Sequence, residues 1–379
     1  MFQEYDFWLL TTSVNHPADV MIAPPVKLGL IRHLNTVKMP FSVLIDNIGE
    51  KTKCENSNLK YVETPPAPEF FAAYQDIEDI NEYMDILSSK HPDFVSVVEV
   101  GTSYEGRSLK LLKISAKTDE VKPAIWIQAG AHAREQIGPA TVLYMAEMLA
   151  TLNNQCDQVS RLIAKFDWYI LPVLNPDGYE YCQKYDRLWR KTRSRHPNSG
   201  NCIGVDANRN WDARWNVATG SSSNPCSHNY AGPRAFSEPE TKSTSDFMLQ
   251  ELQGRLRVFL DFHSYSQRWL TPWGYSADLP PNYQQQKRLA DIATTALQNV
   301  SGTKYSVGST GTIFYTVTGG ARDWAYDVVG AQNSYVIELK DKGEFGFVLP
   351  KRHILPTANE TWIGVKAMAL DLIENLKLK

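Results

Sequence analysis

The chain has 379 residues, a formal net charge of −3, 43% hydrophobic residues and 21% charged residues. This balance is typical of a globular protein with a hydrophobic core, and it excludes a disordered chain. The near-neutral charge gives no reason to expect nucleic acid or an anionic membrane as a partner. No run of about 18 apolar residues occurs, so we expect no membrane span.

Residues 1–50 have a small α/β pattern. We predict a strand in YDFWLLT from residue 5, a short helix in PPVKLGLIRHLNTV from residue 24 and a second strand in FSVLIDNI from residue 41. Glu4 and Asp6 stand where a secretory signal needs a basic start, so we expect no signal peptide here. Residues 51–68 are polar and carry lysines, which predicts an exposed linker that a trypsin-like protease can cleave.

Residues 69–379 have a larger and more regular pattern. Helical spacing of apolar residues predicts helices at 76–92, 138–152 and 358–379. Apolar runs predict strands at 95–101, 109–115, 124–130, 166–174, 257–264 and 334–340. Buried strands that alternate with helices are typical of an α/β domain, in which ligands bind at the carboxyl ends of the strands.

The stretch AGAHARE places His132 and Glu135 directly after a predicted buried strand. One imidazole and one carboxylate from a single turn can hold one edge of a zinc ion, and a catalytic zinc needs a third protein ligand. His263 in LDFHSYS is available at the end of another strand. Alone, the first two residues could form an exposed turn pair and the third could be a core histidine. Together they favour one Zn²⁺ per chain.

Other polar residues stand among apolar neighbours. Glu338 in SYVIELK is costly to bury unless it is paired or functional. Beside zinc it could act as a general base, and the alternative is a structural ion pair with Lys340 or an arginine. Arg190 in DRLWRKTR, and Asn208 with Arg209 in GVDANRNWD, could face solvent or bind a carboxylate. A zinc hydrolase with such a clamp indicates a substrate with a free terminal carboxylate.

Collinear segments extend from about residue 70 to the end, among them SYEGRSLKLLKIS, HARE, VLNPDGYEY, DRLWRKTRS, GVDANRNWDARW, FYTVTGGARDWAYD and IELKDKGEFGF. They resemble the zinc metallocarboxypeptidases of the pancreatic A and B type. The resemblance implies a single α/β domain at residues 69–379, with a twisted eight-stranded mixed sheet flanked by helices. It also implies a partial ferredoxin-like inhibitory prodomain at 1–50, an activation linker at 51–68, and a secreted monomer that protein carboxypeptidase inhibitors could bind.

The same resemblance assigns roles to single residues. It makes His132, Glu135 and His263 the zinc ligands, Glu338 the catalytic glutamate and Arg190 the group that stabilises the oxyanion. It makes Asn208, Arg209 and Tyr315 the groups that bind the terminal carboxylate, and Arg134 and Tyr265 contacts of the outer subsites. It also pairs Cys202 with Cys226. Gln136 departs from the family pattern, which has tryptophan after the ligand glutamate.

Arg322 stands two residues before the tryptophan of TGGARDW. In the family that the chain resembles, this position forms the floor of the pocket for the C-terminal side chain, and O-type members carry a similar cation. A buried guanidinium requires a carboxylate partner and repels Lys and Arg. We therefore expect a preference for C-terminal Glu or Asp. The alternatives are a broad or A-type specificity, with Arg322 neutralised by Asp323 or Asp327, and a deglutamylase of glutamyl conjugates.

Overall fold

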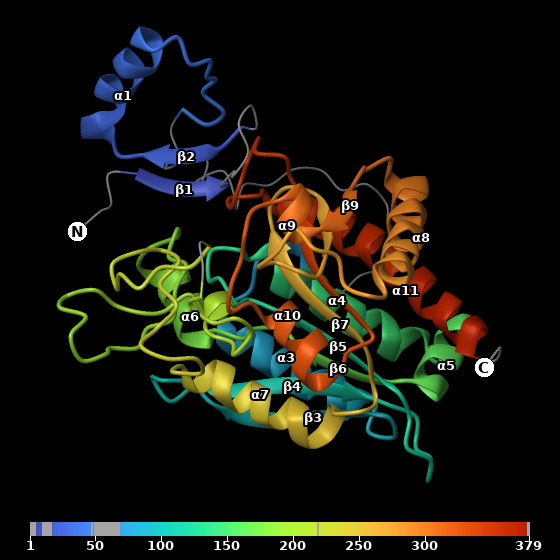
Figure 1. Cartoon of the computed structure of the whole chain (residues 1–379). Helices are drawn as coiled ribbons and strands as arrows, with labels where there is room; N and C mark the ends of the chain where they lie inside the picture. The colour runs from blue at the N-terminus through green and yellow to red at the C-terminus, as the bar shows by residue number, and fades with distance from the viewer. Residues whose placement is uncertain (1–4, 10–16, 47, 49–68, 218–219, 377–379) are drawn as a thin grey trace.

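The computed structural model describes residues 5–9, 17–46, 48, 69–217 and 220–376 (Figure 1). A mixed sheet of eight strands has the spatial order β3-β4-β6-β5-β7-β10-β8-β9. The strands are β3 (Val95–Thr102), β4 (Ser108–Ile114), β5 (Ala124–Ala129), β6 (Asp167–Leu171), β7 (Leu256–Ser264), β8 (Arg268–Thr271), β9 (Ser306–Ser309) and β10 (Asn333–Leu339). The α/β class, the eight strands and all six strand predictions in this domain are confirmed.

The four central strands, β6, β5, β7 and β10, run parallel to one another. Their residues are almost all buried, as expected where helices cover both faces of a sheet. Along β5, Ile125 and Ile127 enter one hydrophobic core while Trp126 enters another, because successive side chains point to opposite faces. The carboxyl ends of these strands therefore meet at one edge between two packed layers.

Helices cover the sheet on both faces. One core contains side chains from α3 (Ile77–Lys90), α4 (Ile137–Leu152), α5 (Asp157–Lys165), α8 (Tyr283–Ser301) and α11 (Ile354–Leu376). The other contains side chains from α7 (Pro239–Leu252), α10 (Ala321–Trp324) and the π-helix η3 (Ala325–Val329). The remaining helical segments are η1 (Glu69–Ala72), α6 (Pro176–Lys184), η2 (Ala207–Arg209), α9 (Thr310–Ile313) and η4 (Lys351–His353). Within the described ranges, no helix has the length and apolarity needed to cross a membrane.

The N-terminal segment forms a small unit against the main domain, blue in Figure 1. Strands β1 (Tyr5–Leu9) and β2 (Asp19–Ile22) pair antiparallel, and helix α1 (Pro24–Thr36) follows. The expected strand at 41–48 is wrong: its described residues, 41–46 and 48, form no strand. No neighbouring strand in the described part of the unit pairs with them, and β2 is too short to give a clear alternating pattern. The whole predicted linker, residues 51–68, lies outside the described residues.

A buried carboxyl group at the start of α7 gives a pH-dependent contribution to stability. Glu240 is fully buried, and one carboxylate oxygen accepts a 3.0 Å hydrogen bond from the amide of Tyr104. Burial raises the pKa of Glu240 from its ordinary 4.5 to about 8. The folded state therefore holds this proton more tightly than the unfolded state. The stability that this proton contributes is present below pH 4.5 and is lost as the pH rises through 8.

We predict that Glu240→Gln raises the melting temperature at pH 8 by about 2–4 °C and changes it little at pH 4.5. The amide keeps the shape of the side chain and removes the cost of ionising it. Thermal unfolding of both proteins at the two pH values measures the difference. An equal shift at both pH values would mean that the carboxyl group does not titrate in this way.

Candidate active site

Neighbouring parallel strands bring four predicted site residues to one edge of the sheet. His132 and Glu135 lie in the turn that follows β5, His263 lies near the end of β7, and Glu338 lies near the end of β10. Glu338 is the register partner of His263 across the β7–β10 pairing. The site lies at the carboxyl ends of the strands, where the sequence analysis expects it.

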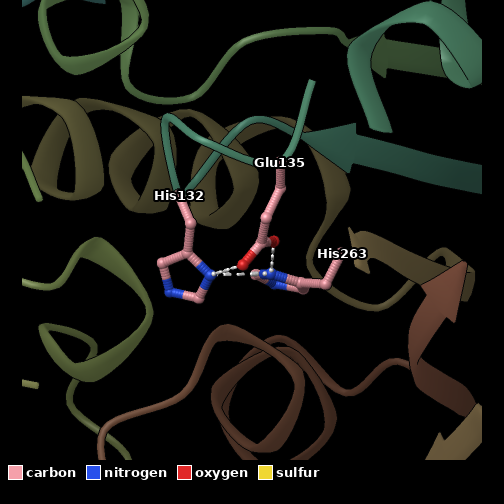
Figure 2. Close-up of side chains that lie close together, drawn as sticks. All are labelled: His132, Glu135 and His263. Carbon is pink, nitrogen blue, oxygen red and sulfur yellow. Dashed lines mark hydrogen bonds and ion pairs between the residues drawn. The ribbon is translucent and has the colours of Figure 1, made fainter. Parts of the chain in front are cut away.

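The side chains of His132, Glu135 and His263 converge on a single point (Figure 2). Their candidate ligand atoms all lie within 4.8 Å of one another. Nδ1 of His263 lies 3.0 Å from Nδ1 of His132 and 2.8 Å from a carboxylate oxygen of Glu135. Nδ1 of His132 lies 2.8 Å from the other carboxylate oxygen. Two imidazole nitrogens and a carboxylate are a donor set that suits catalytic zinc.

The opposite ring nitrogens contact two buried carboxylates. Nε2 of His132 lies 2.9 Å from Asp206, and Nε2 of His263 lies 3.1 Å from Asp261. A carboxylate that accepts the Nε2–H proton leaves the lone pair on Nδ1 for a metal. Nε2 of His263 also lies 3.0 Å from Nδ2 of Asn208. The three residues therefore fit a zinc ion in donor type, and Asp206 sets the tautomer of His132.

These two carboxylates were not predicted. Asp261 gave a usable signal, since it stands two residues before His263 and so lies on the same face of β7. Asp206 in GVDANRNWD gave none, because its partners come from distant parts of the chain.

The charges around this point favour a bound cation. Burial lowers the pKa of His263, but Asp261 and Glu135 raise it by more, so the net shift is upward. Burial raises the pKa of Glu135, but His132 and His263 lower it, and the net shift is downward. Glu135 therefore stays ionised and stabilises positive charge where the ligand atoms meet.

Arg190 is fixed beside the ligands by Asp206. Its Nη2 lies 2.7 Å and its Nε 3.2 Å from the second carboxylate oxygen of Asp206. Its Nη1 lies 3.7 Å from Glu135. Asp206 therefore links the ligand His132 and the guanidinium of Arg190 in one buried network.

A cavity of about 30 Å³ lies next to the ligands. It is lined by His132, Asn208, Arg209, His263, Leu270, Thr310, Phe314, Tyr315, Val317, Gly320, Arg322, Val336 and Glu338. Asn208 and Arg209 are held by backbone contacts: Asn208 accepts from the amide of Ala321, and Arg209 donates to Gly220 O. A volume of this size holds about two water molecules.

Glu338 lines this cavity and does not pair with Lys340, which forms a 2.7 Å ion pair with Glu360. The alternative of an ion pair with Lys340 is therefore wrong. Burial and the charge of Glu135 raise the pKa of Glu338 to about 8, although His263 and Arg190 lower it. A carboxyl group with a raised pKa next to a metal position is suited to accept and return a proton.

The guanidinium of Arg322 also lines the cavity and is paired. Its Nη1 donates to Thr310 Oγ1, and its Nε and Nη2 each lie 2.8 Å from Oδ1 of Asp323. The other oxygen of Asp323 accepts from the amide of Gly274 at 2.8 Å. Asp323 is the internal acid that the sequence analysis considered as a partner.

Arg134 and Tyr265 contact the N-terminal segment. Nη1 of Arg134 donates to Asp6 at 2.7 Å, and the hydroxyl of Tyr265 donates to Asp19 at 2.6 Å. The ring of Trp8 packs against Tyr265 and against Phe347. The N-terminal segment thus contacts both residues to which the resemblance assigns a role in the outer subsites. Asp6 and Asp19 were not predicted as contacts, because nothing in the local sequence marks them.

Two further features lie near the site. Cys202 and Cys226 form a disulfide bond with a Cα–Cα distance of 5.0 Å, as the resemblance implies. Gln136 is buried at the start of α4, and its Nε2 lies 4.0 Å from Sγ of Cys182. The side chains of His132 and Glu135 converge even though Gln136, and not the tryptophan of the family pattern, follows Glu135.

The fold and the site define the class of an α/β metal-binding protein with ligands at the carboxyl edge of a mixed sheet. The sequence profile described as zinc carboxypeptidase matches residues 80–364, and that described as carboxypeptidase activation peptide matches residues 1–53. The chain therefore belongs to the zinc carboxypeptidase family, and it is a metallocarboxypeptidase of the A/B type.

Individual relatives agree with this assignment. Carboxypeptidase B of Astacus astacus is 44% identical over 79% of this chain and 97% of its own length. Carboxypeptidase A4 of Mus musculus is 38% identical over 97% of this chain and 87% of its own. The structure of thrombin activatable fibrinolysis inhibitor matches with a TM-score of 0.89 at 31% identity, over 98% of this chain and 93% of that one.

We predict that Asp206→Asn lowers the affinity for zinc by about 10–100-fold, because His132 loses the carboxylate that holds its Nε2–H. Competition with a chromophoric chelator measures the affinity of the purified protein. Asp212→Asn, at an exposed position of the same segment, is the matched control. Equal affinities in the two variants would contradict the role of Asp206.

Proposed function

We propose that this protein hydrolyses the last peptide bond of peptides with a free C-terminal carboxylate, with a preference for C-terminal Glu or Asp. The proposed hydrolysis of the last peptide bond rests on one observation. The same cavity is lined by two of the expected metal ligands, His132 and His263, and by Glu338, Asn208 and Arg209. A carboxylate clamp next to a hydrolytic centre selects a substrate end rather than an internal bond.

The catalytic roles follow from the positions of the side chains. Bound zinc supplies a Lewis acid that lowers the pKa of water and polarises a carbonyl group. Glu338 takes a proton from the attacking water and delivers it to the nitrogen of the leaving amine. Arg190, oriented by Asp206, donates hydrogen bonds to the carbonyl oxygen as it gains negative charge.

The terminal carboxylate is held by Asn208, Arg209 and Tyr315. The backbone contacts of Asn208 and Arg209 fix both side chains before the substrate arrives, so the scissile bond is positioned at little further cost in entropy. Tyr315 lines the same cavity, and its ring packs on Phe314 at 4.1 Å between centroids. Displacement of these two rings would enlarge the cavity for the substrate side chain.

The preference for an acidic side chain rests on Arg322. Its three contacts use one N–H of each nitrogen, and a guanidinium has five N–H donors. Donors therefore remain for a substrate carboxylate. Gly274 leaves room for this group, since a Cβ at that position would lie 2.3 Å from Nη2. Charge-assisted hydrogen bonds in a buried pocket favour an acidic end over a basic one.

A second candidate is the broad or A-type specificity. The observation that favours it is the Arg322–Asp323 pair, which neutralises the pocket charge, together with apolar lining from Leu270, Val317 and Val336. A neutral, largely apolar pocket would accept aliphatic or aromatic side chains. A deglutamylase of glutamyl conjugates would use the same site as the first candidate on a different substrate.

The N-terminal unit is proposed as an inhibitory prodomain of residues 1–50, followed by an activation linker at 51–68. Its Asp6 and Asp19 engage Arg134 and Tyr265, so it would compete with a peptide for the outer subsites. Cleavage by a trypsin-like protease in the linker would release it.

The disulfide and the matching activation-peptide profile support a secreted zymogen. A related structure, bovine thrombin-activatable fibrinolysis inhibitor, is in complex with tick carboxypeptidase inhibitor, which suggests proteins of that kind as partners.

We predict that Glu338→Gln lowers kcat by about 10²–10⁴-fold and leaves the zinc content unchanged, because the amide cannot accept the proton of the attacking water. Peptide hydrolysis after removal of the N-terminal unit and metal analysis of the same sample measure the two quantities. Glu344→Gln, at an exposed position, is the control. Activity of the Glu338 variant within tenfold of the parent would refute the assigned role.

For the specificity, we predict that peptides ending in Glu are hydrolysed with a kcat/KM about 10–100-fold above those ending in Phe, and that Lys ends are poorest. Arg322→Met should reverse the order of Glu and Phe, and Arg322→Asp should favour Lys. Arg195→Met, at an exposed position, should change nothing. Faster release of Phe than Glu by the unaltered enzyme would favour the broad specificity instead.

A further inference from the structure

The sequence contains two N-x-S/T motifs, at Asn299 and Asn359, and the fold treats them differently. We propose that Asn299 is an N-glycosylation site of the folded protein and that Asn359 is not. The proposal goes beyond the catalytic function and depends only on passage of the chain through a secretory pathway.

Asn299 lies in the last turn of α8 and is exposed, as are its neighbours Gln298 and Val300. The helix ends at Gly302, whose φ of 73° turns the chain away from the helix axis. The hydroxyl of Ser301, the third residue of the motif, lies at this same end of the helix. Both groups that define the motif are therefore at the surface. Unwinding of this last helical turn would cost little stability.

The surface next to Asn299 has room for a sugar. A hollow of about 610 Å³ is lined by Asn299, further residues of α8 and Ala367 of α11. Its charged groups are already paired, Lys287 with Asp291 at 2.6 Å and Arg288 with Asp371 at 2.7 Å. Such a surface does not require an ionic partner. It offers hydrogen bonds to the hydroxyl groups of a neutral, hydrated ligand such as a glycan.

Asn359 is in a different environment. It lies in α11, on the part of the helix that packs against α4, and its Oδ1 accepts from the hydroxyl of Tyr144 at 3.5 Å. The next two residues, Glu360 and Thr361, are fully buried. Asn359 itself is half-buried, so a glycan on its Nδ2 would meet the packed residues around it. Folded molecules therefore carry none at this position.

The modification forms a bond between Nδ2 of Asn299 and the anomeric carbon of an oligosaccharide. The donor is a lipid-linked oligosaccharide pyrophosphate: its bond from the anomeric carbon to the phosphate oxygen breaks, and the lipid pyrophosphate leaves. The amide nitrogen loses one proton, and nothing is oxidised or reduced. The protein supplies the accessible amide of Asn299, which accepts the sugar, and the hydroxyl of Ser301, which the motif requires.

The test is to secrete the full chain from insect cells with a leader peptide and to map glycans by mass spectrometry before and after treatment with peptide N-glycosidase in heavy-oxygen water. The parent and Asn359→Gln should each carry one glycan. Treatment with the glycosidase should convert Asn299 to an Asp that carries heavy oxygen. Asn299→Gln and Ser301→Ala should carry none, and Ser301→Thr should restore the glycan.

Secreted protein with unmodified Asn299, or a glycan on Asn359 of folded protein, would overturn the proposal. Peptide hydrolysis by the same samples separates this outcome from the catalytic proposal. Asn299 is exposed on α8 and does not line the cavity beside the metal ligands, so Asn299→Gln should keep the parent kcat/KM within about twofold, the scale expected of an exposed substitution.

Discussion

One buried carboxylate, Asp206, connects the parts of the site. One of its oxygens holds Nε2 of His132 and the other holds the guanidinium of Arg190. Burial raises the pKa of Asp206, but Arg190, His132 and Arg209 lower it, and the net shift is far downward. The ionised group therefore sets the tautomer of His132 and the position of the guanidinium of Arg190. Neither could hold its geometry if this carboxylate were neutral.

Charge balance also governs the specificity pocket. Arg322 could not remain buried without a counter-charge, and Asp323 supplies one. The pair neutralises the charge of the guanidinium, and contacts with Thr310 and of Asp323 with the amide of Gly274 fix its position.

The sequence predicted the elements that depend on local pattern. His132, Glu135 and His263 could be identified because they stand at the ends of apolar strands, and the resemblance added Tyr315 and the roles of the single residues. The partner of Arg322, the role of Asp206 and the contacts of Asp6 with Arg134 depend on residues distant in the chain or on competing neighbours. The false strand at 41–48 shows that β pattern alone does not supply a pairing partner.

The central claim is a zinc site that acts only on a free C-terminus, and paired peptides with a carboxylate or an amide at the end test it most directly. After cleavage of the linker, mass spectrometry should record removal of single residues from the free acid and none from the amide. Chelation should abolish the reaction, and added zinc should restore it. Equal cleavage of both peptides, or cleavage at internal bonds, would contradict the claim.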